Sequence, residues 1–198
     1  MLATNNAGKL AELRALLADL PMDLVGYGDL GLDLEVEEDG ATYSANARKK
    51  AEAGVRVSGL PALGDDSGME VAALDGKPGV HSARFAGLEN KGRSEALIAA
   101  VLAALGDRAR TGSAALYRCI AVIALPDGRS FEGEGILAGT ICPEPRGRGG
   151  FGYDPIFQLA DGRRMAELTI DEKNLLSHRA RALTALEVHG AFDAAMTC

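Results

Sequence analysis

The stretch Gly64-Asp65-Asp66-Ser67-Gly68-Met69-Glu70 largely decides the fold, because it sets two adjacent carboxylates beside a short apolar run. Leu60 to Leu63 precedes it and Val71 to Leu74 follows it, so the pattern predicts the mouth of a buried strand. Ionised groups at such a place are normally paired, exposed or bound to a cation, because unpaired burial is costly. The stretch therefore indicates either a magnesium-dependent site or a polar turn between two strands.

The composition of the chain limits the classes of protein to which it can belong. The 198 residues are 47% apolar and 25% charged, which is typical of a globular protein with one domain or two closely packed lobes. A net charge of −7 argues against binding nucleic acid through a broad basic surface, although a local basic pocket for a phosphorylated ligand stays open. Cys119, Cys142 and Cys198 are far apart, so we expect neither a disulfide framework nor a zinc site. Without a membrane-length apolar run or a signal peptide, we expect a cytoplasmic protein with no membrane partner.

The N-terminal stretch predicts a strand-to-helix turn from Thr4 to Lys9. A short apolar run precedes it, and leucines then recur at helical spacing up to Pro21. Backbone N–H groups at a helix N-terminus, together with the charge of Lys9, suit a phosphate. The turn is not a true P-loop, because Ala3 and Leu10 stand where that motif needs Gly and Ser or Thr. A plain helix cap is the alternative.

The rest of the chain alternates helical and strand patterns, which predicts an α/β architecture. Helices are expected from Thr42 to about Val57 and from Ser94, as its cap, to a stop at Gly106. Residues 116–125 and 129–139 predict a β-hairpin, in which Gly133 and Gly135 suggest a bulge or bend. A capping box at Thr169 to Glu172 starts a last helix, whose apolar face contains Leu175, Leu176, Leu183 and Leu186.

Three further groups of residues have both a structural and a functional interpretation. The acidic run before Gly40 is typical of a solvated loop, but one member could be a metal ligand. Phe151-Gly152-Tyr153-Asp154 follows a loop rich in Pro and Gly, and its aromatic rings either stack on a planar base or pin the loop to the core.

The third group lies on the last helix, where Lys173 and His178 are roughly 140° apart at about 100° per residue. Either this helix bends near Ser177, or Lys173 and the pair His178-Arg179 contact different parts of a large ligand. Read alone, these residues are a solvated polar patch. No G-x-S-x-G motif surrounds a serine, so a hydrolase triad is poorly supported.

Taken together, these motifs resemble the inosine triphosphate pyrophosphatase family, which hydrolyses inosine and xanthosine triphosphates and their deoxy forms. The resemblance spans nearly the whole chain. It is carried by Ala3 to Lys9, by Asp65 to Gly68 with Pro78-Gly79-Val80 and Ser82 to Phe85, by Gly149 to Pro155, and by Glu172-Lys173 with Ser177-His178-Arg179. Members generally carry a few more residues before the first motif, whereas only Met1 and Leu2 precede it here. This departure affects the expected first strand, at the edge of the sheet, more than the expected site.

The resemblance implies roles for individual residues. Thr4-Asn5-Asn6-Ala7-Gly8-Lys9 would bind the triphosphate, and Ser67 would contact substrate. Glu38 and Asp66 would be associated with Mg²⁺, with Asp66 also the catalytic base. Phe151-Gly152-Tyr153-Asp154 would hold the base and sugar, and Lys173, His178 and Arg179 would complete the nucleotide pocket.

The resemblance also implies a fold and an assembly. The expected fold is α/β, a single domain over residues 1–198 with a long twisted mixed β-sheet flanked by helices and two lobes with the active-site cleft between them. A homodimer is expected. The alternatives are a general nucleotide phosphatase that releases orthophosphate and a nucleotide-binding regulator without turnover, which would have no need of Asp65 and Asp66.

Overall fold

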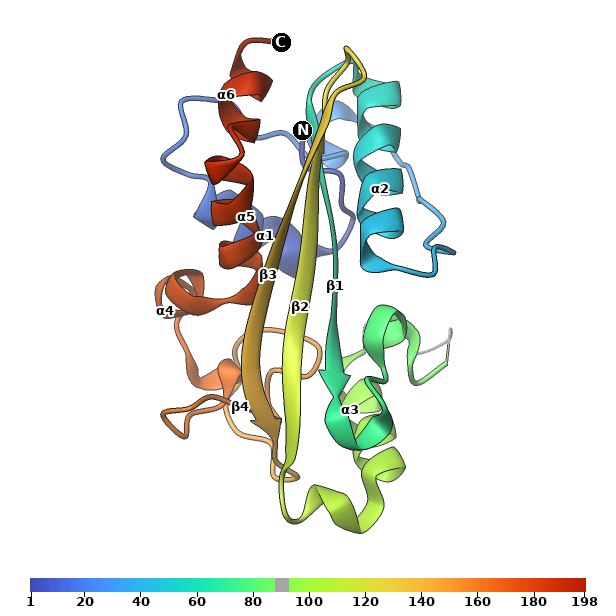
Figure 1. Ribbon diagram of the computed structural model, residues 1–198, viewed down its shortest axis with the longest axis vertical. Coiled ribbons are helices and arrows are strands. Elements are labelled where there is room, and N and C mark those ends of the chain that lie inside the picture. The colour runs from blue at the N-terminus through green and yellow to red at the C-terminus, as the bar shows by residue number, and fades with distance from the viewer. Residues whose placement is uncertain (88–92) are drawn as a thin grey trace. The chain divides into compact units, whose positions relative to one another are not determined.

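The structure, a computed structural model, describes residues 1–87 and 93–198 (Figure 1). The chain forms two compact units, each assembled from segments distant in sequence. The first unit comprises Met1–Asp66, Cys119–Gly135 and Ser177–Cys198, and the second comprises Ser67–Arg118 and Ile136–Leu176. The prediction of a single domain over residues 1–198 stays a prediction.

A four-stranded sheet has the order β1 (Ala62–Val71), β2 (Ser113–Ala124), β3 (Ser130–Ile141) and β4 (Phe157–Gln158). The predicted hairpin is confirmed, since β2 and β3 are neighbours joined by a turn in which the Leu125 N–H donates to the Arg129 carbonyl at 2.9 Å. β3 pairs antiparallel with β4, whereas Leu2 forms parallel bridges with Gly26 and Leu63. The predicted mixed α/β fold is therefore confirmed, while a cleft between two lobes stays a prediction.

The helices of the first unit are α1 (Ala7–Leu16), η1 (Gly28–Leu30), α2 (Tyr43–Ser58), α5 (His178–Val188) and α6 (Ala191–Met196). Their apolar faces share one core with the adjoining strand segments, formed by residues that include Leu2, Leu13, Leu63, Ala121, Leu183, Leu186 and Phe192. Figure 1 shows α2 beside β1 and α5 beside β3.

Two glycine positions let these helices approach the strands. A Cβ at Gly64 of β1 would lie 2.5 Å from the carbonyl oxygen of Ala47 in α2. A Cβ at Gly135 of β3 would collide with the carbonyl oxygen of His178 in α5. The glycines of β3, interpreted from the sequence as a bulge or bend, are thus explained by the close approach of α5.

The second unit contains η2 (Ala72–Leu74), η3 (Gly79–Arg84), α3 (Ser94–Leu105), η5 (Gly106–Ala109), η6 (Met165–Glu167) and α4 (Ile170–Leu176). Its separate core includes Met69, Leu97, Val101, Tyr117, Ile141, Ile156 and Phe157. The helix α3 ends at Gly106 as predicted. Its N-cap is Arg93, so the assignment of Ser94 as the cap was wrong. The Ser94 hydroxyl instead accepts a hydrogen bond from the Gly152 N–H at 2.8 Å.

Two further predictions need correction. Asp65 and Asp66 lie within β1 and not at its mouth, because charged partners compensate both carboxylates and allow the strand to continue. The predicted last helix does bend at Ser177, one of the two alternatives, but the bend is a full break, because Ser177 has extended backbone angles and separates α4 from α5. Consequently Leu175, predicted to lie on the apolar face, is 88% exposed. Among the described residues, no helix has the length and apolar character needed to cross a membrane.

Candidate active site

Asp65 and Asp66 are two adjacent buried carboxylates of the first unit, 1% and 3% exposed. Successive side chains of a strand point to opposite faces of the sheet, so the two residues meet different partners. Each set of partners includes a lysine from a helix of the same unit.

Asp65 is held by two cations. Its Oδ2 lies 3.0 Å from Lys9 Nζ and accepts hydrogen bonds from Nη2 and Nε of Arg179 at 3.2 and 3.3 Å. Burial alone would raise the pKa of Asp65, but the charges of Lys9, Arg179 and Lys50 outweigh it and hold the pKa below its usual value. Asp65 is therefore ionised at neutral pH.

Asp66 has a different environment. Its Oδ1 lies 3.2 Å from Lys50 Nζ, and its Oδ2 accepts a hydrogen bond from Asn46 Nδ2 at 3.1 Å. Lys50 Nζ also lies 3.0 Å from Glu38 Oε2, so one ammonium group joins both predicted metal ligands. Burial, the largest effect, and the nearby Glu38 raise the pKa of Asp66, whereas Lys50 and Lys9 oppose the rise.

Lys50 and Asn46 were missed by the sequence analysis. They lie four residues apart on α2, beside Ala47 and Ala51, and all four residues are buried. Residues at this spacing share one helix face. A lysine and an asparagine within an apolar stripe that packs on a strand were therefore a signal for buried polar partners.

The predicted strand-to-helix turn is confirmed, with α1 beginning at Ala7 and Gly8 in its first turn. Asn6 caps the helix by accepting from the Lys9 N–H at 3.0 Å, and the Thr4 hydroxyl accepts from the Asn6 N–H at 3.2 Å. Asn5 Nδ2 donates to the Leu34 carbonyl at 2.8 Å. The turn thus brings the Lys9 ammonium group to Asp65.

The break at Ser177 places His178 and Arg179 in the first turn of α5, where the Ser177 hydroxyl caps the helix by accepting from the Ala180 N–H at 3.1 Å. Both residues are buried. The Arg179 guanidinium forms ion pairs with Asp65 and with Glu12 of α1. Glu12 was also missed, although a buried acidic residue on the apolar side of a helix needs a cationic partner.

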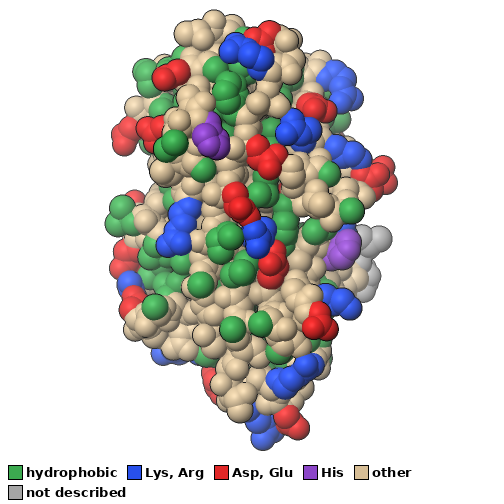
Figure 2. Space-filling view, in the orientation of Figure 1, with side chains coloured by type: hydrophobic (Ala, Val, Ile, Leu, Met, Phe, Trp, Pro, Cys, Tyr) green, Lys and Arg blue, Asp and Glu red, His purple; other side chains and the backbone are tan. Residues whose placement is uncertain are grey.

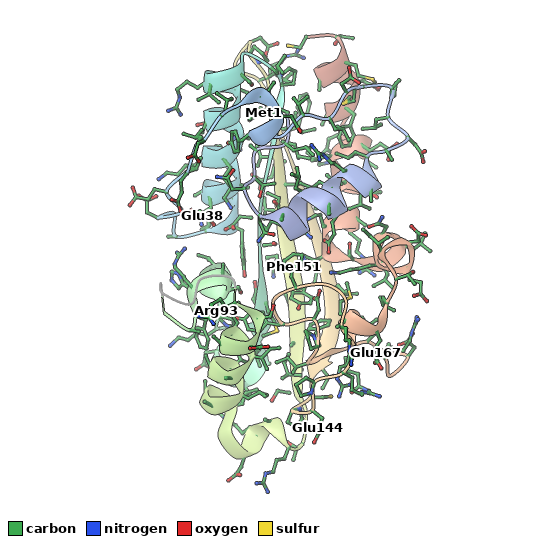
Figure 3. The ribbon with its side chains drawn as sticks, turned by 180° about the vertical axis from the view of Figure 1, so that it is seen from behind. Met1, Glu38, Arg93, Glu144, Phe151 and Glu167 are labelled. Carbon is green, nitrogen blue, oxygen red and sulfur yellow. The ribbon has the colours of Figure 1, made fainter. Side chains whose placement is uncertain are left out.

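The second unit contains the aromatic loop. Phe151 N–H donates to Asp154 Oδ2 at 3.0 Å, and Lys173 Nζ donates to the same oxygen at 2.7 Å. Lys173 Nζ also lies 5.1 Å from the centroid of the Phe151 ring, a cation–π geometry. The adjoining Tyr153 is buried, and its hydroxyl donates to the Ser82 carbonyl at 2.8 Å. Phe151, the side chain labelled in Figure 3, belongs to the loop between β3 and β4.

The predicted site residues therefore fall into two groups. Thr4 to Lys9, Glu38, Asp66, His178 and Arg179 belong to the first unit, where Lys9, Arg179 and the two aspartates are brought together. Ser67, Phe151 to Asp154 and Lys173 belong to the second unit, where the loop and Lys173 are brought together.

The carboxylates of Glu38 and Asp66 are the candidate ligands of a divalent cation. Mg²⁺ usually takes one or two carboxylates and completes its shell with water and substrate phosphates. Glu38, labelled in Figure 3, and Asp66 fit this requirement, because both carboxylates converge on the single positive charge of Lys50. No group of three or more His, Cys, Asp and Glu side chains suited to a metal occurs in residues 1–87 and 93–198. The set fits a cation shared with substrate and does not form an all-protein cage.

Known proteins resemble this chain in sequence and in fold. A sequence profile of the Ham1 family matches residues 1–189. The chain belongs to the Ham1 family. It is 47% identical over 190 residues to a protein of Geobacter sulfurreducens named dITP/XTP pyrophosphatase, covering 96% of this chain and 94% of the relative. A protein of the same name from Streptomyces coelicolor is 48% identical over 189 residues, covering 94% of both.

Solved Ham1 structures agree with the fold. The Ham1 protein of Staphylococcus aureus matches with a TM-score of 0.80 and 37% identity, covering 95% of each chain. A HAM1 protein from Coxiella burnetii matches with a TM-score of 0.80 and 39% identity, covering 94% of this chain and 95% of that one. These Ham1 matches confirm the predicted family and fold class.

Proposed function

We propose that this chain hydrolyses dITP, ITP and XTP to the nucleoside monophosphate and pyrophosphate. Its Ham1 relatives are named dITP/XTP pyrophosphatases. The observation that carries the proposal is the pairing of Asp65 and Asp66 with the cationic side chains of Lys9, Lys50 and Arg179 in one compact unit. A regulator that only binds nucleotide would have no need of two buried carboxylates.

The electrostatics suit a triphosphate. Lys9 lies in the first turn of α1, whose N-terminal N–H groups attract anions, so Thr4 to Lys9 would bind the phosphate groups. Lys50 adds a second positive charge, and its pKa stays raised because Asp66, Asp65 and Glu38 outweigh the effect of burial. Both lysines would stabilise the charge that develops on the bridging oxygen as the bond to pyrophosphate breaks.

We assign the catalytic base to Asp66. A water oxygen forms a bond to phosphorus, the bond between that phosphorus and the bridging oxygen breaks, and Asp66 takes the proton of the water. The raised pKa of Asp66, caused mainly by burial, brings the carboxylate closer to the value a general base needs. Glu38 and Asp66 would hold Mg²⁺, which when bound supplies charge neutralisation on the phosphate oxygens.

Base selection is assigned to the donors near the aromatic loop and the start of α5. Hypoxanthine and xanthine present an acceptor at O6, where adenine presents an amino donor. His178 or Arg179 can donate to such an acceptor, whereas adenine would leave the donor unpaired. Phe151 to Asp154 would hold the base and sugar, with the Phe151 ring against the base, and Ser67 would contact substrate.

Product analysis tests the proposal. The purified protein is incubated with Mg²⁺ and, in parallel, with ITP, dITP, XTP, ATP and GTP. Monophosphate plus pyrophosphate from the first three, with little from the others, is the expected result. Orthophosphate release would identify a general nucleotide phosphatase, and binding without cleavage would identify a regulator. Omission of Mg²⁺ should abolish turnover if Glu38 and Asp66 share a cation with substrate.

The assembly is a separate proposal. We propose a homodimer formed by one domain per chain, as in the family that the sequence resembles. Analytical ultracentrifugation of the purified protein tests the dimer, and a species at the monomer mass, 20.6 kDa, would contradict it. We also propose a small-molecule substrate and no nucleic acid partner, on the basis of the net charge of −7. On the face that Figure 2 shows, acidic and basic side chains are interspersed.

A further inference from the structure

The Asp154 carboxylate in the second unit is occupied by groups of the protein itself. Its Oδ2 accepts from Lys173 Nζ and from the Phe151 N–H, and its Oδ1 accepts from the Tyr117 hydroxyl at 2.9 Å. The side chain is buried, with Asp154 only 4% exposed. A carboxylate offers about four lone-pair sites, and three of them are used here. Within the stretch Phe151 to Asp154, which we propose holds the base and sugar, Asp154 therefore acts by holding neighbouring groups in place.

The groups that Asp154 holds are those proposed to meet the nucleotide base. The Phe151 backbone is fixed by Oδ2, and the Phe151 ring faces the same Lys173 ammonium that Oδ2 binds. Gly150 has a φ of +70°, and a Cβ there would collide with Asp154 Oδ2. The loop thus closes tightly on this carboxylate, and a rotation of Asp154 would move Phe151 and Lys173 together.

Tyr117 is what connects this carboxylate to the sheet. It lies in β2, is 6% exposed, and stacks on Phe157 with ring centroids 4.2 Å apart. Neither the stacking nor the burial requires the hydroxyl, whose contact with Asp154 is a bond to a charged acceptor. Such bonds contribute more than those between neutral groups.

We propose that Tyr117 is a positioning residue for the base-binding loop: its hydroxyl orients the Asp154 carboxylate, which in turn sets the positions of Lys173 and Phe151. The inference rests on the proposed function and extends it, because it adds a residue of β2 to those proposed to determine base binding.

The test is Tyr117→Phe, which removes one hydroxyl and keeps the ring stacked on Phe157. The KM for XTP and dITP should rise about tenfold, as expected for one lost bond to a charged group, while kcat changes by less than about twofold. The matched control is Tyr27→Phe in the first unit, whose buried hydroxyl has no hydrogen-bond partner among the described residues. This control should leave KM and kcat unchanged.

A double-mutant cycle separates positioning from stability. If Tyr117 acts through Asp154, adding Tyr117→Phe to Asp154→Asn should raise KM by less than about twofold further. If the two substitutions instead raise KM by factors that multiply in the double variant, the two residues act independently and the inference is overturned. So would a lower melting temperature for Tyr117→Phe with an unchanged KM, because the hydroxyl would then serve stability alone.

A reporter tests the network without turnover. The chain contains no tryptophan, so Phe151→Trp introduces a unique fluorophore into the loop. In the protein without nucleotide, Tyr117→Phe should shift its emission to longer wavelength as the loop loosens, whereas Tyr27→Phe should not. An unchanged spectrum would overturn the inference. A shifted spectrum in a protein that hydrolyses no nucleotide would support the positioning of the loop and overturn the proposed function instead.

Discussion

Asp65 and Asp66 are neighbours in the chain, yet the groups around them shift their pKa values in opposite directions. Two ion pairs keep Asp65 ionised, whereas burial and Glu38 act against the charge on Asp66. Environments that shift the pKa values of two carboxylates in opposite directions are typical of sites in which one group exchanges protons and the other maintains the charge balance. These opposite shifts are in keeping with the proposal that Asp66, and not Asp65, accepts the proton, a choice that the adjacent residues in the sequence left open.

At the residue scale, Asp66→Asn should lower kcat at least about 100-fold, because the amide cannot accept the proton of the attacking water. The fold should be retained, since the amide can still accept a hydrogen bond from Asn46 or Lys50. Steady-state kinetics and circular dichroism measure the two effects. The exposed Asp75→Asn is the control, and an Asp66→Asn enzyme with wild-type kcat would remove Asp66 from the mechanism.

A second residue-scale prediction concerns pH. The folded-state pKa of Asp65 lies below its unfolded value of about 4, so its contribution to stability is complete above that pH and is lost as the pH falls through the folded pKa. Asp65→Asn should therefore be less stable than wild type at pH 7, by about 3 kcal/mol, because Arg179 loses a buried partner. The difference in the free energy of unfolding between wild type and Asp65→Asn should become smaller below about pH 4.

Urea denaturation at several pH values measures this difference in the free energy of unfolding. Asp193→Asn, an exposed site, controls for the change in net charge. A gap that stays constant from neutral to acidic pH would show that the Asp65 charge does not contribute as described.

At the element scale, the contact between β3 and α5 depends on the absence of a side chain at Gly135. Gly135→Ala should destabilise the protein by about 3 kcal/mol, because the new Cβ collides with the backbone of α5. It should also raise KM, since the collision displaces the turn that carries His178 and Arg179. Gly28→Ala is the matched control, because no atom lies within 4 Å of a Cβ there. Equal melting temperatures for the two variants would contradict the explanation.

Elements set by local chemistry could be predicted from the sequence. The helix start at Thr42, the turn before α1 and the Thr169–Glu172 capping box depend on residues a few positions apart, and all three occur as predicted. The course of β1 could not be predicted, because two adjacent carboxylates are tolerated inside a strand only when partners from elsewhere in the chain compensate them. Arg179 is 114 residues away from Asp65.

The same limit applies to the candidate site. Lys9, Glu38, Asp66 and the aromatic loop were recognisable through local motifs and a family resemblance. Lys50 and Glu12 carry only the weaker signal of a charged residue on an apolar helix face, which indicates a buried partner without identifying it. Tyr117 carries no such signal, because its role depends on the group that it meets in the folded chain. The break at Ser177 belongs between these cases: the geometry of Lys173 and His178 required a bend or a large ligand, and the structure shows the bend.

At the scale of the whole molecule, each of the three long strands begins in one compact unit and ends in the other. The boundary falls between Asp66 and Ser67 in β1, between Arg118 and Cys119 in β2, and between Gly135 and Ile136 in β3. Loss of pairing in one part of a strand removes support from its remainder. We therefore expect the two units to unfold in a single cooperative transition.

Two tryptophan reporters test this expectation. Phe131→Trp places the probe beside the core of the first unit, and Phe85→Trp beside that of the second. Urea titrations followed by fluorescence should give coincident midpoints for the two variants once each is corrected for its own stability by circular dichroism. Two transitions, or a probe that departs from the circular dichroism curve, would show that the units unfold independently.

The discontinuous first unit also has a consequence for synthesis on the ribosome. Asp65 and Asp66 leave the exit tunnel early, with Lys9 and Lys50 already made, but Arg179 belongs to the third and last segment of the first unit. Until that segment emerges, the Asp65 carboxylate lacks its guanidinium partner, and the core of the first unit lacks Leu183 and Leu186. The nascent chain therefore cannot complete the core of the first unit until residues 177–198 have emerged, and activity should appear only after that point.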